Sequence, residues 1–298
     1  MTDPAILAQR RTEAIAALEA QIATAAGDAQ RDLYERLLAR LQDVYTTPAL
    51  LPALLQEYAT ATLLPLAYAY GSAMLQLPAL NVSYFKELDV AGYQALKAPL
   101  TEFLAGRLGV DASGAVVPGG YLDLLAGNTV VRQQVLTYAY SAQASGTGLE
   151  AYRVGLKQLV LGGDKPAEGL VATLYREAGD DFSRNDRALQ TIAAKELGLQ
   201  AFLYQGGLID SSRPFCRVRN GKAFADFEVR KFGTKADVFG GYSDKAAGKF
   251  SGKSEPYDPF TDCGGYGCRH GLHAIPNLVA LRMREDLAEN KDGVLVIK

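Results

Sequence analysis

Apolar residues recur at helical spacing through the first 45 positions of the chain. The first stripe consists of Ile15, Leu18 and Ile22. After Gly27 the same spacing returns at Leu33, Leu37, Leu41 and Val44. Residues three or four positions apart share one face of a helix, and glycine often separates two helices. The pattern therefore predicts a helical hairpin with one apolar stripe on each helix and a break near Gly27.

Helical patterns continue through most of the next 150 residues. We expect a helix over 51–77 that is broken or kinked at Pro65, because proline cannot donate the helical hydrogen bond. Further helices are expected over 91–108, 121–142 and 149–161, and another is expected to begin at Pro166. The glycine-rich segment 111–120 reads as a loop.

The pattern changes near Phe202, where helical periodicity stops. Short aromatic and β-branched runs alternate there with Gly, Pro, Ser and Asp, which is typical of small strands and loops. The predicted fold is a mainly α N-terminal body with a small C-terminal α+β module, for which a zinc tie is one interpretation. The domain boundaries that we expect are a helical body over 1–145 and a second part over 146–298, with a helical lead-in over 147–201, the α+β module over 202–275 and a tail over 276–298. Residues 231–257 are expected to form an exposed loop.

Composition narrows the class of protein. The 298 residues carry 31 basic and 33 acidic side chains, so the net charge of -2 does not indicate a nucleic-acid-binding chain. The first residues lack the basic and apolar regions of a secretory signal. No charge occurs between Glu57 and Lys86, yet Pro65, Gly71 and other polar or helix-breaking residues interrupt the apolar run. We expect a buried or interface helix there and no membrane contact.

Every cysteine and histidine of the chain lies between residues 216 and 273. Thiolate and imidazole are preferred zinc ligands, and a structural site uses four of them. The expected set is Cys216, Cys263, Cys268 and His270, with His273 as a substitute for Cys263. Such a metal would stabilise a module that has few aliphatic residues. Two alternatives stay open, namely a disulfide such as Cys216–Cys268 and unpaired buried thiols with ordinary histidines.

The stretch 211–256 is locally basic, with ten Lys or Arg against five Asp or Glu, and aromatic residues are interleaved with the charges. Such a pattern can hold phosphates and stack bases. The basic residues considered for nucleic-acid contact are Arg217, Arg219, Lys222, Arg230 and Lys231. A solvated loop whose aromatic residues pack on the body explains the same pattern, and we favour that interpretation.

Two blocks of the C-terminal part resemble the phage head morphogenesis family, the Mu-type minor head proteins. The first block is Phe202-Leu-Tyr-Gln-Gly-Gly-Leu-Ile-Asp-Ser-Ser-Arg-Pro-Phe-Cys216, followed by Asn220-Gly-Lys-Ala-Phe224. The second is Asp258-Pro-Phe260 with Gly264-Gly-Tyr-Gly-Cys268-Arg-His270, which is similar to the family's Gly-Gly-Tyr-Asn-Cys-Arg-His ending. The resemblance covers roughly residues 147–275, and Gly267 replaces the usual Asn.

The resemblance implies a structural, non-enzymatic minor head protein that associates with the portal or the capsid interior of a virion or procapsid, assembled in the host cytoplasm. It also implies that packaged DNA is a potential contact. Two alternatives are kept. One is a zinc-dependent hydrolase or nuclease, which would need an open metal position and a base such as Asp258 or Asp262. The other is an internal protein that is ejected with the DNA or a membrane-active protein, either of which would use residues 58–85.

Overall fold

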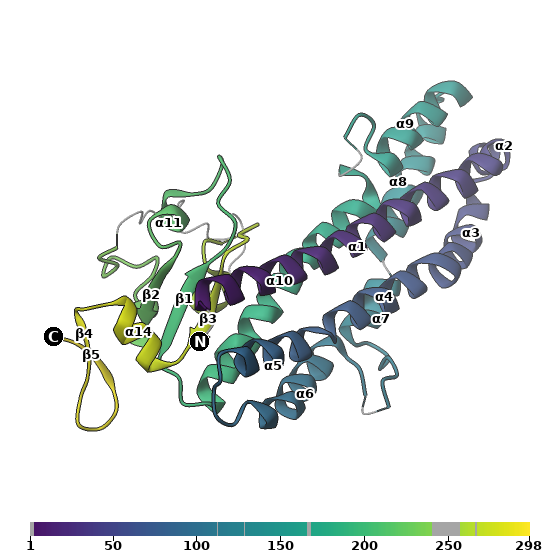
Figure 1. The fold of residues 1–298 in the computed structure, drawn as a ribbon. Coiled ribbons are helices and arrows are strands. Elements are labelled where there is room, and N and C mark those ends of the chain that lie inside the picture. The colour runs from purple at the N-terminus through teal and green to yellow at the C-terminus, as the bar shows by residue number, and fades with distance from the viewer. Residues whose placement is uncertain (1–2, 112, 128, 166–167, 240–256, 266) are drawn as a thin grey trace. The chain divides into compact units, whose positions relative to one another are not determined.

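The computed structural model describes residues 3–111, 113–127, 129–165, 168–239, 257–265 and 267–298. The chain up to Glu196 is helical (Figure 1). Its α-helices are α1 (Pro4–Ala39), α2 (Leu41–Thr46), α3 (Leu51–Tyr58), α4 (Leu64–Met74), α5 (Leu77–Glu87), α6 (Lys97–Leu108), α7 (Tyr121–Gly127), α8 (Thr129–Ala144), α9 (Leu149–Leu161) and α10 (Leu170–Glu196). Short turns of other helix types are η1 (Pro48–Leu50), η2 (Ala59–Leu63) and η3 (Tyr93–Leu96).

Small strands and short helices make up the C-terminal part. The strands are β1 (Ala201–Gln205), β2 (Lys222–Ala225), β3 (Gly271–Ile275), β4 (Leu287–Glu289) and β5 (Leu295–Ile297). The helices are α11 (Pro214–Arg217), α12 (Asp226–Val229), α13 (Pro259–Asp262) and α14 (Asn277–Met283). The predicted fold class, a mainly α body followed by a small α+β module, is confirmed. The segment expected as a tail forms α14 and the β4–β5 hairpin.

The predicted helical hairpin at the start of the chain is wrong, because α1 is one uninterrupted helix of 36 residues. Gly27 lies inside it and does not end it. The buried stripe continues without a gap from Ile22 through Ala26 and Ala29 to Leu33. A glycine inside a helix costs only about 1 kcal/mol relative to alanine, and burial of this continuous stripe offsets that cost.

Other predicted helices differ mainly in their ends. The interruption expected near Pro65 is the π-helical turn η2, after which Pro65 lies in the first turn of α4. The helix expected over 91–108 begins later, at Lys97, after Gly92 adopts a left-handed φ of 84°. The segment 121–142 contains two helices, α7 and α8. Pro166 lies outside the described residues, as does the part of the expected exposed loop over 240–256.

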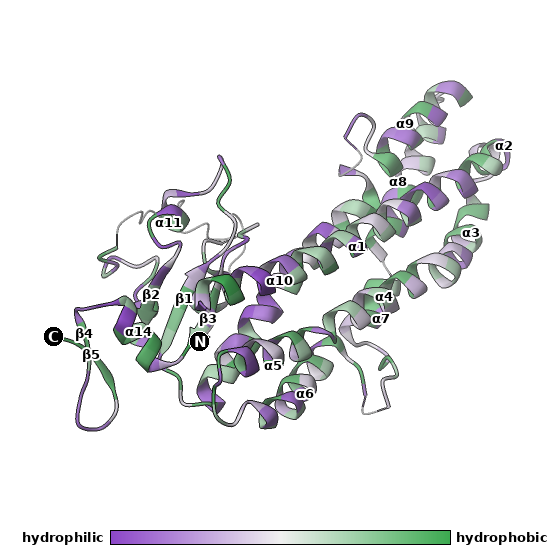
Figure 2. Cartoon of the chain, in the orientation of Figure 1, coloured by the Kyte–Doolittle hydropathy of each residue, from purple (hydrophilic) through white to green (hydrophobic). Residues whose placement is uncertain are grey.

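The uncharged segment between Glu57 and Lys86 forms α4, most of α5 and the turn before them. Figure 2 shows α4 mainly in green and white, in keeping with its lack of charge. Several of its side chains, including Leu66, Tyr70 and Met74, are buried. Within the described part of the chain, we find no helix with the length and hydropathy needed to cross a membrane.

The chain divides into two compact units. Unit 1 comprises Met1–Ala17, Gln76–Glu102 and Asp180–Lys298, and unit 2 comprises Leu18–Leu75 and Phe103–Gly179. This discontinuous division differs from the boundary expected near residue 145. Three of its four crossings fall inside α1, α6 and α10. A boundary inside a helix has no linker composition, so the residue pattern could not reveal it.

Unit 2 is a helical unit held by apolar packing and by tyrosine hydroxyls. Tyr58 donates to the carbonyl of Ala29 at 2.9 Å, and Tyr70 donates to that of Ala178 at 2.8 Å. Both tyrosine rings are buried. Each bond joins segments distant in sequence and satisfies a polar group that burial would otherwise leave unpaired.

Unit 1 contains a three-stranded antiparallel sheet in the order β2-β1-β3 (Figure 1). Phe202 in β1 pairs with Phe224 in β2 and with Ala274 in β3. Central strand β1 is buried over its first four residues, as expected for a strand paired on both edges. Phe215, Phe224 and Phe232 pack edge to face against one another and complete the core beside the sheet.

Candidate metal centre

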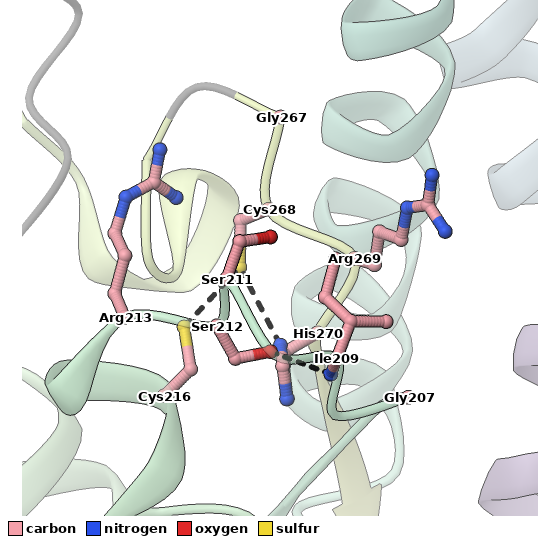
Figure 3. A pocket seen from close by; sticks show the side chains of 10 residues that line it. All are labelled: Gly207, Ile209, Ser211, Ser212, Arg213, Cys216, Gly267, Cys268, Arg269 and His270. Atoms are coloured by element: carbon pink, nitrogen blue, oxygen red, sulfur yellow. Dashed lines mark hydrogen bonds between the residues drawn. The ribbon is translucent and has the colours of Figure 1, made fainter.

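Two loops that flank the three-stranded sheet bring Cys216, Cys268 and His270 together. Cys216 lies in α11, which follows β1, whereas Cys268 and His270 lie just before β3. The Sγ atoms of Cys216 and Cys268 are 3.8 Å apart, and Cys268 Sγ is 3.8 Å from His270 Nδ1 (Figure 3). All three potential ligand atoms lie within 4.8 Å of one another, and all three residues are buried. We call this set the Cys2His group.

The spacing of the Cys2His group fits one tetrahedral metal ion. With Zn–S bonds of about 2.3 Å and Zn–N bonds of about 2.0–2.1 Å, tetrahedral ligands lie about 3.8 Å apart for two sulfurs and about 3.6 Å for sulfur and nitrogen. The observed separations of 3.8 Å and 3.8 Å match these edges. The Cys2His group could therefore hold a metal ion.

The two thiols have opposite pKa shifts. A hydrogen bond from the Cys216 thiol, together with His270 and the charge of Arg187, holds the pKa of Cys268 well below its ordinary value. The pKa of Cys216 is raised, first by that same hydrogen bond and then by burial. Both shifts have the same leading cause, the hydrogen bond between the two sulfurs. Metal binding would require both sulfurs as thiolates, since only thiolate sulfur is a good ligand.

Backbone and phenol groups also bond the sulfurs. The N–H of Gly264 donates to Cys268 Sγ at 3.3 Å, and the hydroxyl of Tyr204 donates to Cys216 Sγ at 3.4 Å. The Tyr204 ring also stacks on His270, with centroids 5.3 Å apart. These contacts fix the direction of each ligand side chain before any metal arrives.

Arg187 of α10 holds the loop that carries two of the ligands. Its guanidinium donates to the carbonyls of Thr261 at 2.9 Å and His270 at 3.0 Å, and to that of Cys268. Burial alone would lower the pKa of Arg187, but the neighbouring thiol groups of Cys263 and Cys268 raise it overall, so the side chain is charged. No motif singled out Arg187 in the sequence.

Two glycines allow the loops to approach so closely. A Cβ atom on Gly264 would lie 2.5 Å from Cys216 Sγ and 2.9 Å from Cys268 Sγ. A Cβ atom on Gly206 would lie 2.7 Å from the carbonyl oxygen of Arg269 and 2.7 Å from the Cα of His270. Both glycines belong to the blocks that resemble the phage family, and the structure gives each a packing reason.

The expected fourth ligand, Cys263, does not join the Cys2His group. It is fully buried at the end of α13, with a φ of 48°. Burial raises the pKa of Cys263 to about 12. Proximity in sequence to Cys268 suggested a ligand, but the sulfur of Cys263 does not lie within 4.8 Å of all three other candidate ligand atoms.

His273, the expected substitute, also lies outside the Cys2His group. Its Nδ1 is 3.1 Å from the Arg11 guanidinium, and its Nε2 is 3.5 Å from the Thr12 hydroxyl. Burial, followed by the charge of Arg11, lowers the pKa of His273 well below its ordinary value, so the ring is neutral. His273 lies within β3, whereas His270 precedes the strand. The two side chains therefore lie in different buried environments.

His273 belongs to a second buried polar cluster, which we call the Arg11 network. Its members are Arg11, Asn81, Asp186, Gln190 and His273, and all are buried. Arg11 forms an ion pair with Asp186 and donates to Asn81 Oδ1 at 3.3 Å. Gln190 donates to the same oxygen at 2.6 Å and accepts the N–H of Ala274 at 2.8 Å. The network joins α1, α5, α10 and β3 within unit 1.

Of the residues considered for nucleic-acid contact, Arg219 is excluded by its position. Its side chain is fully buried, pairs with Asp237 and lies over the rings of Phe215 and Phe232 at 3.8 Å and 4.5 Å from their centroids. The basic and aromatic pattern around Arg219 is thus core packing. Aromatic residues of the same stretch, namely Phe215, Phe224 and Phe232, are buried with it.

The other four basic residues are exposed. Arg217 donates to the carbonyls of Ile209, Asp210 and Ser212. Arg230 is paired with Asp226, and the ammonium of Lys231 lies 5.8 Å from the centroid of the Phe227 ring. Lys222 begins β2. These groups are accessible to an anion, but the structure gathers no site around them.

Asp258 and Asp262, the candidate bases, have structural partners. The Asp258 carboxylate accepts the N–H of Phe260 at 3.0 Å and caps α13. Asp262 accepts the N–H of Asp258 at 2.8 Å and pairs with Arg184 at 3.1 Å. Neither lines the pocket of about 170 Å³ that opens onto the Cys2His group.

The chain was compared with family models, curated proteins and solved structures, and none of them matches it. Its resemblance to the phage head morphogenesis family therefore rests on the two quoted blocks of its own sequence.

Proposed function

We propose that this protein is a structural, non-enzymatic minor head protein of a bacteriophage, and that a zinc ion on Cys216, Cys268 and His270 ties its C-terminal module. The observation that carries the proposal is the convergence of the two family-like blocks. Residues 202–224 and 258–270 are separate in sequence, yet their cysteines and histidine meet at ligand spacing. The resemblance and the geometry thus concern the same residues.

Zinc is the metal that the donor set favours. Two thiolates and one imidazole are soft to intermediate ligands, and the distances suit a tetrahedral ion. The ion would bind Cys216, Cys268 and His270 and would join α11 to the loop before β3. Metal binding contributes to folding free energy in small modules of this kind. The disulfide alternative would link the same two sulfurs and is separated by the metal and thiol measurements below.

The proposed role is structural because the group lacks a nearby base. A metal-dependent hydrolase needs a carboxylate or imidazole that can take a proton from metal-bound water. In the described part of the chain no carboxylate lines the pocket at the Cys2His group, and His273 is bound in the Arg11 network. Among the described residues, the pocket therefore offers the hydrolase or nuclease alternative no lining carboxylate.

The proposed partners are the portal and capsid proteins of the same particle, and the proposed location is the phage head. Contact with packaged DNA would use exposed residues such as Lys222, Arg230 and Lys231, without Arg219. Ejection with the DNA is the second particle role kept from the sequence, and no structural feature favours it over a portal-associated role.

Coassembly tests this function. The full chain would be expressed with the portal and major capsid proteins encoded in the same genome, and procapsids would be separated by gradient sedimentation. We expect the protein to sediment with procapsids in a few copies per particle. The Cys268→Ser variant should associate less, whereas the exposed Arg10→Met variant should associate normally. A folded, metal-loaded chain that never sediments with particles, or that hydrolyses nucleic acid, would contradict the proposal.

A further inference from the structure

A pocket opens directly onto the Cys2His group. It has a volume of about 170 Å³, and Cys216, Cys268 and His270 all contribute to its wall. Ser211, Ser212, Arg213 and Arg269 also line it (Figure 3). A tetrahedral ion needs four ligands, whereas the described residues bring only three candidate ligands together here. The fourth position of an ion at this group would face the pocket.

The residues that could close the fourth position are otherwise engaged. Cys263 lies outside the Cys2His group and does not line the pocket. Both ring nitrogens of His273 face other partners, Nδ1 the Arg11 guanidinium and Nε2 the Thr12 hydroxyl. A structural zinc site normally has four protein ligands, and a site with three keeps a position for an external ligand.

The charge around the pocket favours an anion. Two thiolates would balance the charge of a divalent ion. Arg213 and Arg269 are the positively charged residues among those that line the pocket, and Figure 3 shows both guanidinium groups directed away from the three ligand side chains. The hydroxyl oxygen of Ser212 accepts the N–H of Ile209 at 2.8 Å, so its own hydrogen is available to donate. Arginine and hydroxyl donors are the groups that bind carboxylate and phosphate oxygens.

We infer that the ion at the Cys2His group keeps one position open to this pocket and binds an oxyanion oxygen there. The inference rests on the metal site of the proposed function and gives that site a binding role besides stabilisation. The shared chemistry is an anionic oxygen on the metal with arginine and serine donors around it. A carboxylate of another protein chain and a phosphate are the two sources, and the experiment separates them.

The number of sulfurs on the metal tests the open position. X-ray absorption of the zinc-loaded full chain should show two sulfur ligands and two nitrogen or oxygen ligands. The Cys263→Ser variant should give the same result, because Cys263 is not a ligand. Three sulfurs would overturn the inference alone and leave a closed structural site. A protein that takes up no metal would overturn both the inference and the zinc part of the proposed function.

Cobalt substitution tests the anion. The visible bands of the Co²⁺-loaded full chain should shift and saturate on titration with sodium acetate, inorganic phosphate or both, and sodium perchlorate at equal ionic strength should leave them unchanged. A response to acetate alone assigns a carboxylate, and a response to phosphate alone assigns a phosphate. Unchanged bands with both anions would overturn the inference.

Arg269 provides a variant that separates anion binding from metal binding. The side chain of Arg269 is exposed, so the Arg269→Gln variant should lower the affinity for the anion by only roughly twofold to fivefold. Its affinity for Co²⁺ should be unchanged. Gly207→Ala is a matched control at the same pocket, where an added Cβ meets no atom within 4 Å. Equal anion affinity in wild type and Arg269→Gln would remove Arg269 from the site.

Discussion

The two histidines of this chain stand three residues apart and have opposite environments. His270 faces the thiol of Cys268 with Nδ1, and its buried Nε2 has no hydrogen-bond partner among the described residues. His273 faces partners with both nitrogens, Arg11 at 3.1 Å and Thr12 at 3.5 Å. Both rings are buried, so burial does not separate a ligand from a core residue here.

The difference lies in what completes each polar cluster. In the Arg11 network a buried guanidinium is matched by a carboxylate, an amide and an imidazole, and its Nε is the one buried atom of the network without a hydrogen-bond partner among the described residues. In the Cys2His group, Cys268 Sγ lies 3.8 Å from both Cys216 Sγ and His270 Nδ1, and these separations suit ligands of one ion. The first cluster should be insensitive to metal, and the second should depend on it.

The largest expected effect is the loss of a ligand. Cys268→Ser removes the sulfur that lies 3.8 Å from both other ligand atoms. Loss of an outer hydrogen-bond partner already weakens metal binding by roughly 10–100-fold, and loss of a ligand should exceed that. Metal affinity would be measured by competition with a chromophoric chelator. The matched Cys263→Ser variant should bind metal normally, and equal losses in both variants would contradict the three-ligand geometry.

The next effect concerns the Arg11 network alone. Arg11→Met leaves the Asp186 carboxylate buried without its cation, and breaking a buried ion pair costs about 3–5 kcal/mol of unfolding free energy. Arg10→Met is the matched control, because Arg10 is exposed and lies 4.0 Å from Glu87, and it should change stability by about 1 kcal/mol or less. Urea denaturation measures both variants.

The metal content of the Arg11→Met variant tests whether the Arg11 network and the Cys2His group are independent. Arg11→Met should retain wild-type metal stoichiometry as long as it is folded, because no member of the Arg11 network belongs to the Cys2His group. A folded Arg11→Met protein without metal would show that the two clusters are not independent.

Gly264→Ala tests the close approach of the loops. The added Cβ would lie 2.5 Å from Cys216 Sγ, so a ligand must move, and overpacking of this kind costs about 1–3 kcal/mol, or roughly fivefold to hundredfold in metal affinity. Gly207→Ala adds the same atom where nothing lies within 4 Å and should leave affinity unchanged. Isothermal titration of zinc against both variants measures the difference, and equal affinities would argue against a preformed site.

The smallest expected effect is a pH dependence from His273. Burial and then the charge of Arg11 hold the pKa of His273 in the folded protein well below its ordinary value of 6.5. Below pH 6.5 the unfolded chain therefore binds a proton at this histidine that the folded chain does not bind. Stability from this group is thus present above pH 6.5 and falls as pH decreases, by up to about 1.4 kcal/mol per pH unit. The slope of unfolding free energy between pH 6.5 and 5.5 should be shallower in His273→Gln. Equal slopes would contradict a neutral buried His273.

Local sequence patterns predicted much of the helical body. The bounds of α9, Leu149–Leu161, agree with the expected 149–161, because Gly148 and Gly162 mark both ends and the apolar spacing is regular between them. The break predicted at Gly27 was wrong, because the cost of one glycine in α1 is smaller than the stabilisation from the buried stripe that extends on both sides of it. The change to strands near Phe202 was also visible, because periodicity and composition change together there.

The candidate site was predictable only in its residue types. Clustering of cysteine and histidine identified the three members of the Cys2His group, but it could not separate them from Cys263 and His273. That choice depends on the φ of 48° at Cys263 and on Arg11, which lies 262 positions before His273. The buried positions of Arg187 and Arg219 could not be predicted either, because a buried arginine and an exposed one cannot be distinguished in the sequence without knowledge of the tertiary packing.

Metal content measured together with thiol reactivity tests the central claim most directly. The account predicts about one zinc per full chain by elemental analysis, with Cys216 and Cys268 resistant to alkylation until a chelator removes the metal, and with Cys263 unaffected by the chelator because it is buried and is not one of the three ligands. Peptide mapping would assign each modified thiol. Metal-free protein whose Cys216 and Cys268 react equally with and without chelator, or are joined as a disulfide, would contradict it.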